Sequence, residues 1–146
     1  MYVADCMTQG VEVVSPKLTL QEAARIMREA ETGALPVGRD GRLIGMITDR
    51  DIAVRAIADG RGPETRVMDV MTPEVCCCFD DDHLDTAAAI MADNQVRRLP
   101  VLRRDDCRLV GIISLGDLSQ AADDEDGLRS GEALSAIAEP GGVHVQ

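Results

Sequence analysis

Aromatic residues are almost absent from this sequence. Its 146 residues include no tryptophan, one tyrosine and one phenylalanine, although 45% are hydrophobic. The core must therefore be built from aliphatic, methionine and alanine side chains. A chain of this length and hydrophobic content can form one compact domain or two small domains that share a core.

Positive charge is also scarce. Against 26 Asp and Glu there are 15 Lys and Arg, and the formal net charge is -11. The negative electrostatic field of such a protein would repel nucleic acid and an anionic membrane, so we expect neither as a partner. No run approaches the roughly 20 apolar residues of a membrane span, and residues 1–10 lack the basic and apolar regions of a signal peptide. The sequence therefore predicts a cytoplasmic protein.

Residues for catalysis and metal binding are few. Neither histidine, His83 or His144, accompanies a nucleophile and an acid, and the sequence has no Walker loop and no GxGxxG. The acidic DDDH at 80–83 could chelate a divalent cation, but such a segment is more typical of a solvated helix start. We therefore predict no enzyme, no catalytic residues, no catalytic cofactor and no metal site.

The five cysteines do not form a recognisable framework, because they are odd in number and lack CxxC spacing. Cys6 and Cys107 stand alone, whereas Cys76, Cys77 and Cys78 are consecutive. Consecutive side chains of an extended segment point to opposite sides, so these three thiols cannot converge on one metal. Core packing is the simpler explanation, and redox sensing is the alternative.

The sequence contains an internal duplication. The offset between the copies is 64 residues at first and 66 later, and the matching pairs are MT at 7–8 and 71–72, LPV at 35–37 and 99–101, and GMITDRDI at 45–52 and GIISLGDL at 111–118. The two extra residues fall in the polar RRDDCR segment, where an insertion costs little. A period this long suits a duplicated small domain rather than a solenoid.

Each copy has the same predicted order of strand, helix, strand, strand and helix. The expected ranges are 11–14, 20–31, 34–37, 43–47 and 49–59 in the first copy, and 75–79, 83–93, 98–102, 108–113 and 115–122 in the second. Thr19 has the pattern of an N-cap with acidic support from Glu22, and GRDG at 38–41 is a turn sequence. One copy alone has too little core, so we expect the two to pack sheet to sheet.

The doubled element order, the LPV strands and the phrase G-h-h-[ST]-x-x-D-[IL], where h is apolar, resemble a tandem pair of CBS domains, the regulatory module named after cystathionine beta-synthase. The resemblance covers about residues 5–122, and the chain is similar to small stand-alone bacterial CBS-pair proteins. It implies an α+β fold of two β-α-β-β-α repeats, at 5–62 and 67–122, packed as a pseudo-twofold pair. An acidic linker, a short helix and a disordered tail are expected at 123–146.

The repeated phrase places a hydroxyl and a carboxylate at the start of a helix in each copy, as Thr48 with Asp51 and as Ser114 with Asp117. A carboxylate offers two acceptors to the vicinal hydroxyls of a ribose, and a nearby hydroxyl can donate to a phosphate or sugar. Free N–H groups at the same helix start favour an anion. The simpler alternative is that each aspartate only caps its helix.

The resemblance implies a regulatory adenosine ligand, such as AMP, ADP, ATP or NAD, in clefts between the copies. One cleft would combine Ile112, Ser114 and Asp117 with Thr32 and Gly33, and the other would combine Met46, Thr48 and Asp51 with Val96 and Arg97. Gly33 would leave room for a base or sugar, although it also suits the end of a helix.

Four arginines are candidates for phosphate contact, because a guanidinium pairs two phosphate oxygens and keeps its charge. Arg50 and Arg55 belong to the first copy, and Arg97 and Arg98 belong to the second. For Arg50 and Arg55, ion pairs with neighbouring acids such as Asp49 and Asp59 are the simpler explanation.

Three functions follow from these observations. The first is a sensor that binds an adenine nucleotide, shifts between two arrangements of its copies and signals in trans to an unknown effector protein. The second is a dimerising scaffold that needs no ligand, and the third is a thiol sensor. The resemblance also implies a homodimer formed through helices, and the Ala and Ile residues of 51–58 are compatible with it.

Overall fold

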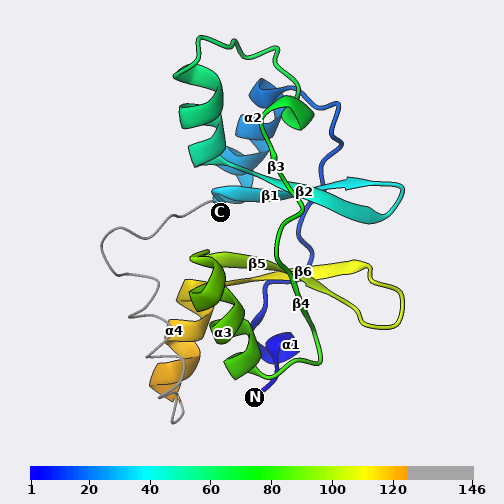
Figure 1. Ribbon diagram of the computed structural model, residues 1–146, viewed down its shortest axis with the longest axis vertical. Coiled ribbons are helices and arrows are strands. Elements are labelled where there is room, and N and C mark those ends of the chain that lie inside the picture. Colours follow the sequence, from blue (N-terminus) through cyan, green and yellow to red (C-terminus); the bar gives the residue numbers. More distant parts are fainter. Residues whose placement is uncertain (125–146) are drawn as a thin grey trace. The chain divides into compact units, whose positions relative to one another are not determined.

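The computed structural model describes residues 1–124, and the chain divides into two compact units (Figure 1). The repeat 1 unit consists of Glu12–Val75. The repeat 2 unit combines Met1–Val11 with residues 76–124. The second unit is therefore assembled from two separate parts of the chain. The short helix and the tail predicted beyond residue 124 lie outside the described residues.

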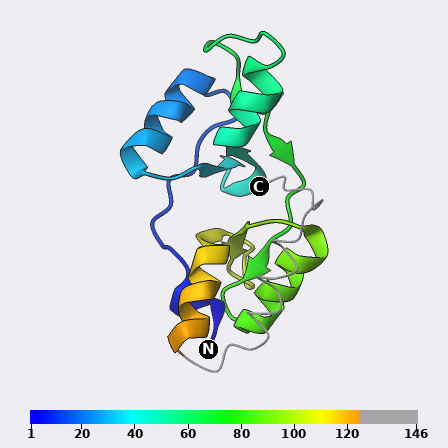
Figure 2. The ribbon, with the colours of Figure 1, turned by 90° about the vertical axis from the view of Figure 1, so that its left-hand side faces the viewer.

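The repeat 1 unit contains a three-stranded antiparallel sheet with the strand order β1-β2-β3. The strands are β1 (Ala34–Arg39), β2 (Arg42–Thr48) and β3 (Thr72–Pro73), and the helices are α2 (Leu20–Ala30), the π-helix η1 (Asp51–Ile57) and the 3₁₀-helix η2 (Val67–Asp69). Helices α2 and η1 lie on the same face of this sheet (Figure 2).

The repeat 2 unit has a mixed sheet in the order β4-β5-β6, in which β4 runs parallel to β5 and β5 runs antiparallel to β6. Its strands are β4 (Cys78–Phe79), β5 (Arg98–Leu102) and β6 (Leu109–Ser114), and its helices are α1 (Val3–Cys6), α3 (Leu84–Asn94) and α4 (Leu115–Asp124). The two units together confirm the predicted α+β fold with two repeats.

Local sequence explains where the longer helices begin and end. The Thr19 hydroxyl accepts a hydrogen bond from the Glu22 N–H at 3.2 Å, and the Glu22 carboxylate accepts one from the Thr19 N–H at 3.3 Å. This capping box confirms the predicted start of α2. Helices α2 and α3 end at left-handed residues, Glu31 with φ 53° and Gln95 with φ 54°. Gly33 is therefore not the residue that ends α2, and that alternative for Gly33 was wrong.

Each unit has its own core, and equivalent positions fill both. The repeat 1 core includes Leu20, Ala23, Met27, Leu35, Val37 and Ile47. The repeat 2 core includes the matching Leu84, Ala87, Met91, Leu99, Val101 and Ile113. These side chains are aliphatic, methionine or alanine, as the scarcity of aromatic residues predicts.

The hairpins differ in the length of their turns. In repeat 1, Asp40 and Gly41 form a two-residue turn with φ values of 53° and 77°, which confirms the turn predicted at GRDG. In repeat 2, the longer turn is closed by a 2.8 Å hydrogen bond from the Arg103 N–H to the Arg108 carbonyl. The two extra residues lie in this exposed turn, where they leave the sheet register undisturbed.

Both MT segments pair with sheets in a way that the sequence analysis missed. Thr72 in β3 pairs with Met46 of β2, so the MT segment at 71–72 completes the sheet of repeat 1. Thr8 forms an antiparallel bridge with Ile112 of β6, with N–H···O distances of 2.8 and 3.0 Å. The MT segment at 7–8 therefore pairs with the sheet of repeat 2.

The glycine of the repeated phrase is required by this pairing. A Cβ atom on Gly45 would lie 2.7 Å from the Thr72 carbonyl oxygen and 2.9 Å from the Met71 sulfur. A Cβ atom on Gly111 would lie 2.7 Å from the Thr8 carbonyl oxygen and 2.9 Å from the Met7 sulfur. Distances this short exclude a side chain, so the glycine lets the MT backbone approach the sheet.

The predicted first strands were too long. Only Val14 of 11–14 forms a bridge, with Val37, and only Cys78–Phe79 of 75–79 is a strand, because these segments meet the sheet over one or two residues. The helix predicted at 49–59 is the shorter η1. Helices α1 and η2 and strand β3 were not predicted, since segments of two to four residues carry no detectable periodicity. Among the helices of residues 1–124, none has the length and apolar character needed to cross a bilayer.

Candidate functional site

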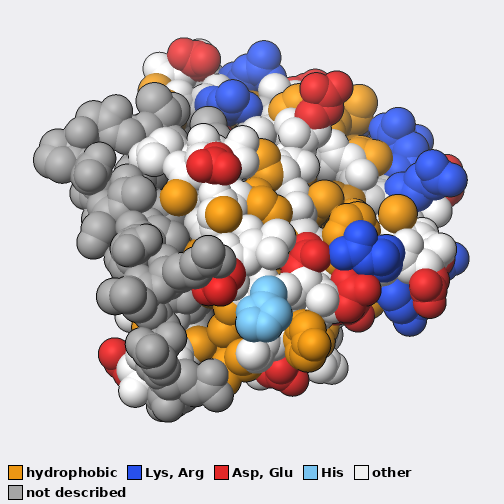
Figure 3. Space-filling view, turned by 60° about the horizontal axis from the view of Figure 1, so that its bottom comes forward, with side chains coloured by type: hydrophobic (Ala, Val, Ile, Leu, Met, Phe, Trp, Pro, Cys, Tyr) orange, Lys and Arg blue, Asp and Glu red, His pale blue; other side chains and the backbone are white. Residues whose placement is uncertain are grey.

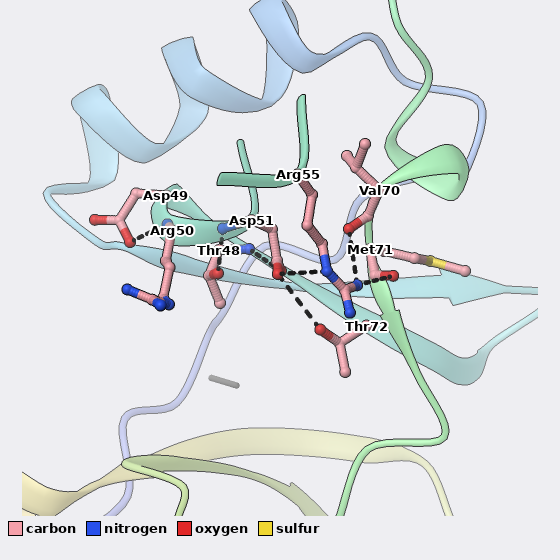
Figure 4. A network of polar contacts seen from close by, with 8 residues as sticks. All are labelled: Thr48, Asp49, Arg50, Asp51, Arg55, Val70, Met71 and Thr72. Atoms are coloured by element: carbon pink, nitrogen blue, oxygen red, sulfur yellow. Dashed lines mark hydrogen bonds and ion pairs between the residues drawn. The ribbon is translucent and has the colours of Figure 1, made fainter. Parts of the chain in front are cut away.

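The hydroxyl and carboxylate of repeat 1 bind one another at the junction of β2 and η1. The Thr48 N–H donates to Asp51 Oδ2 at 3.0 Å, and the Asp51 N–H donates to Thr48 Oγ1 at 3.0 Å (Figure 4). Thr48 is 1% exposed and Asp51 is 6% exposed. This reciprocal pair caps the helix start and fixes the carboxylate in a buried position.

The other carboxylate oxygen of Asp51 faces two further side chains. The Thr72 hydroxyl donates to Asp51 Oδ1 at 3.5 Å, and Arg55 Nε lies 3.9 Å from the same oxygen (Figure 4). Arg55 Nη1 also donates to the Val70 carbonyl at 3.4 Å and to the Met71 carbonyl at 3.2 Å. Arg55 thus links Asp51 to the backbone that leads into β3.

Burial raises the pKa of the Asp51 carboxyl above its ordinary value of 3.8. The hydrogen bonds from Thr48, the charge of Arg55 and the hydroxyl of Thr72 act in the opposite direction, but desolvation is the larger effect. The carboxylate is therefore only partly compensated by the groups around it, and further hydrogen-bond donors would stabilise its charged form.

Repeat 2 builds the same cap with fewer partners. The Ser114 N–H donates to Asp117 Oδ2 at 2.8 Å, and the Asp117 N–H donates to Ser114 Oγ at 3.1 Å. Both side chains are half-buried. Among residues 1–124, no group makes a hydrogen bond or ion pair with Asp117 Oδ1. Ala121 stands where repeat 1 has Arg55.

The predicted capping role of both aspartates is confirmed, and their ligand-binding role stays a prediction. Capping does not use all the capacity of either pair. Oδ2 carries the bond from the backbone, while Oδ1 of Asp117 has an open acceptor. The Thr48 and Ser114 hydroxyls accept in the cap, so each keeps its own O–H for donation.

The turn after the first helix of each repeat lies beside the helix start of the same unit. The Asp49 N–H donates to the Gly33 carbonyl at 2.9 Å, and the Leu115 N–H donates to the Arg97 carbonyl at 2.8 Å. These bonds bring Gly33 close to the Thr48 and Asp51 segment, and they bring Arg97 close to the Ser114 and Asp117 segment. A cleft shared by residues of the two repeats stays a prediction.

Other predicted ligand contacts differ in how available their side chains are. Val96 is 2% exposed and belongs to the repeat 2 core, so a ligand contact there would have to use its backbone. Met46 is buried but alternates with the core residue Ile47, so it points to the opposite face of the sheet. Ile112 is half-buried. The Thr32 hydroxyl donates to the Ala34 carbonyl at 3.2 Å.

The candidate phosphate ligands also separate into two groups. Within residues 1–124, the side chains of Arg50, Arg97 and Arg98 have no ion pair or hydrogen bond, and Arg50 and Arg97 are exposed. Arg55 forms an ion pair with Asp51, four residues earlier on the same helix. The alternative of an ion pair with a neighbouring acid is therefore confirmed for Arg55, with Asp51 as the acid in place of Asp49 or Asp59.

The cysteines within residues 1–124 form no disulfide. Cys78 lies in the core, where burial raises the pKa of its thiol to about 12, and burial also raises the pKa of Cys77. Both thiols therefore stay protonated near neutral pH, whereas redox sensing needs a thiolate. Cys107 is exposed in the turn between β5 and β6. In the described part of the chain, no group of three His, Cys, Asp or Glu is placed to hold a metal ion.

Surface charge agrees with the acidic composition. On the face drawn in Figure 3, acidic side chains are spread among the basic ones. The Arg103 and Arg104 side chains pair with Asp106, Asp81 and Asp82 in the turn region of repeat 2. Those two arginines are therefore not available to an incoming anion.

Comparisons with known proteins match both repeats. The family model of the CBS domain matches residues 3–57 and 67–124. The CBS domain-containing protein YhcV of Bacillus subtilis is 44% identical over 135 residues, which cover 92% of this chain and 94% of that protein.

Two solved structures that resemble the chain contain adenosine compounds. The CBS domain pair of protein MJ0100, in complex with 5-methylthioadenosine and S-adenosyl-L-methionine, has a TM-score of 0.77 and 27% identity, with coverage of 85% of this chain and 97% of that one. CBSX2 in complex with AMP has a TM-score of 0.72 and 29% identity, with coverage of 84% and 96%.

Proposed function

The chain belongs to the CBS-domain family, and on that premise we propose that it is a sensor that binds an adenosine compound and signals to a separate effector protein. CBS domain pairs are regulatory modules. The ligands of the two similar structures differ in their substituents but share the adenosine group. The ligand class that we propose is therefore defined by adenosine.

The open carboxylate oxygen of Asp117 is the observation that carries this proposal. Asp117 Oδ2 is held by the Ser114 N–H, so the carboxylate is oriented before any ligand arrives. Its second oxygen has an acceptor free within the described residues, and a ribose presents hydroxyl donors that suit it. A fixed acceptor loses little freedom on binding, which favours affinity.

Exposed arginines favour a ligand that carries phosphate. Arg97 lies next to the Ser114 and Asp117 segment through the Leu115 N–H bond to its carbonyl, and its side chain has no partner among residues 1–124. Arg50 is similarly exposed beside Asp51 in repeat 1. We therefore place AMP and other adenine nucleotides ahead of uncharged adenosine compounds.

The surroundings of His83 indicate a structural role rather than a catalytic role. Its ring makes an edge-on contact with Tyr2, with 5.5 Å between the ring centroids, and it lies at the start of α3. These contacts give His83 a structural role. We propose no catalytic step for this chain.

A thermal-shift titration tests the proposal. We would measure the melting temperature with AMP, ADP, ATP, NAD, S-adenosylmethionine and GTP, for the wild type and for Asp117→Asn. A ligand at 100 times its dissociation constant stabilises the folded protein by about 2.7 kcal/mol, and we expect an adenine nucleotide to stabilise the wild type clearly more than Asp117→Asn. Asp123→Asn is the matched control, because it removes an exposed carboxylate from the same helix.

The competing scaffold hypothesis makes the opposite prediction. If no adenosine compound raises the melting temperature of protein freed from bound nucleotide, the sensor proposal fails and the ligand-free scaffold takes its place. If Asp123→Asn reduces the shift as much as Asp117→Asn does, the effect is general to acidic residues of α4, and the assignment of Asp117 is wrong.

We further propose that the chain forms a homodimer through η1. Val54 is 50% exposed and Ile57 is 62% exposed on this helix. The equivalent positions of α4 are Gln120 and Asp123, so only the repeat 1 helix offers an apolar surface there.

Light scattering tests the homodimer. The variant Ile57→Asp should be a monomer, and Val13→Asp, at a position 48% exposed outside the helix, is the control. A dimer that survives Ile57→Asp would rule out this surface.

A further inference from the structure

The two half-sites differ at the carboxylate oxygen that we assign to the ligand. Asp117 Oδ1 has no partner among residues 1–124, whereas Asp51 Oδ1 faces the Thr72 hydroxyl at 3.5 Å and Arg55 Nε at 3.9 Å. The two hydrogen bonds that form each cap are the same in both repeats. The hydrogen bonds and ion pairs therefore differ at the acceptor that a ribose would use, and Asp51 is also the more buried carboxylate.

We infer that Arg55 is an internal competitor for Asp51, so that the Asp51 half-site binds an adenosine compound more weakly than the Asp117 half-site. This inference rests on the proposed function, because it assigns a rank to the two sites that the function requires. Arg55 would then determine how many ligands the chain holds at a given concentration.

The contacts of Arg55 show why it competes. A carboxylate oxygen accepts about two hydrogen bonds, and at Asp51 Oδ1 the Thr72 hydroxyl and the nearby guanidinium already provide the favourable interactions. Arg55 is held in place from its other side by the Val70 and Met71 carbonyls. A ribose hydroxyl at this oxygen would share it with the Thr72 hydroxyl and would compete with the guanidinium for the negative charge.

The same contacts show that Arg55 can be displaced. Its side chain is 47% exposed, its distance from Asp51 Oδ1 is long for an ion pair, and its two hydrogen bonds go to neutral carbonyls. Exposed pairs of this kind contribute little free energy. Arg55 therefore weakens the site rather than closing it.

Calorimetric titration of the full chain with AMP and with adenosine tests the inference. Asp117→Asn leaves Asp51 as the remaining site, and adding Arg55→Ala to this variant places at position 55 the residue type that repeat 2 has at Ala121. We expect the added change to raise the affinity for both compounds by roughly twofold to fivefold, the effect of removing one exposed ion pair. The reverse change, Ala121→Arg in Asp51→Asn, should weaken the Asp117 site.

Three other outcomes would overturn the inference, and they differ from one another. Unchanged affinity makes Arg55 a bystander. A loss of AMP affinity with adenosine unaffected makes Arg55 a phosphate contact instead. If neither the wild type nor any variant binds AMP, the proposed function itself fails, which the first two outcomes would not imply. Arg55→Gln, which keeps most of the side chain, repeats the test if Arg55→Ala proves unstable.

Discussion

Repeat 1 and repeat 2 complete their sheets with the same dipeptide taken from different places in the chain. Thr72 lies between the repeats and pairs with β2, while Thr8 precedes repeat 1 and pairs with β6. In both units the carbonyl of this threonine approaches a glycine, Gly45 or Gly111, to the same short distance. The comparison teaches that the duplicated unit is defined by packing, and that its boundaries do not coincide with one continuous copy of the sequence.

The repeats diverge after the glycine. Repeat 1 continues into the π-helix η1, where Arg55 contacts Asp51, and repeat 2 continues into the α-helix α4, where Ala121 stands at the equivalent position. π-Helical turns are rare and occur frequently at functional sites. The two repeats thus keep the same core positions but place different groups around the carboxylate, which is the basis of the proposed difference between the two half-sites.

The largest expected effect comes from filling the space above the two glycines. Gly45→Ala and Gly111→Ala each place a Cβ atom 2.7 Å from a backbone carbonyl oxygen, which cannot move without breaking the pairing of the MT segment. We expect each change to lower the free energy of unfolding by about 1–3 kcal/mol. Urea denaturation measures the loss.

Gly116→Ala is the control for these two changes. Its Cβ atom would have ordinary contact with the Ser114 hydroxyl at 3.6 Å, and alanine favours the helix in which it lies. This variant should be at least as stable as the wild type. Clearly unequal losses for Gly45→Ala and Gly111→Ala would break the equivalence of the two MT segments.

A smaller effect is expected at the helix starts, where the repeats differ. Thr19 caps α2 through the Glu22 N–H, whereas its counterpart His83 makes no side-chain cap at α3. Thr19→Ala should therefore cost about 1 kcal/mol, and His83→Ala should cost clearly less. Thr19→Ser keeps the hydroxyl and should behave like the wild type in the same denaturation assay. Equal losses for Thr19→Ala and His83→Ala would show that the cap contributes nothing.

Local signals made much of the fold predictable from the sequence. The spacing of Leu20, Ala23 and Met27 identified α2, the Thr19 pattern identified its start, and the DG turn at 40–41 identified the first hairpin. Each of these signals depends on residues within a few positions of one another. The internal repeat then extended the same interpretation to the second unit, where the individual signals are weaker.

Long-range pairing was not predictable in the same way. Strand β3 has two residues, and its partner β2 lies about 25 positions earlier, so neither periodicity nor turn chemistry identifies the pair. The signals were present in another form, as a repeated MT and a repeated glycine. Each of these repeated features indicates duplication, and the contact between the MT segment and the glycine explains why both are repeated.

The residues of the candidate site were predictable from the sequence, but the differences between its two copies were not. The phrase identified Thr48 with Asp51 and Ser114 with Asp117, and the structure brings each pair into contact. The sequence could not indicate that Asp51 would be more buried than Asp117, because burial depends on tertiary packing rather than on the repeated phrase. It did contain the spacing of Asp51 and Arg55, which predicts a contact on one helix face.

The smallest expected effect concerns the pH dependence of stability, and it sharpens the difference between Asp51 and Asp117. Burial raises the pKa of Asp51 in the folded protein above 3.8. Between 3.8 and the raised value the folded state binds more protons than the unfolded state, so the contribution of Asp51 to stability falls as pH rises through this window. Above the window that contribution is constant.

Asp51→Asn should remove this decline, and Asp117→Asn, at a half-buried position with the same cap, is the matched change in the other repeat. Other acids contribute with the opposite sign: hydrogen bonding to Arg103 lowers the pKa of Asp106 to about 2, so its stabilisation is lost as pH falls from 3.8 towards 2. Subtracting the wild-type free energy of unfolding from that of the variant at each pH removes the contributions of these other acids. We would measure urea denaturation from pH 3 to pH 7 for all three proteins. If the profile of Asp51→Asn parallels that of the wild type, burial of the Asp51 carboxyl has no measurable effect on the pH dependence of stability.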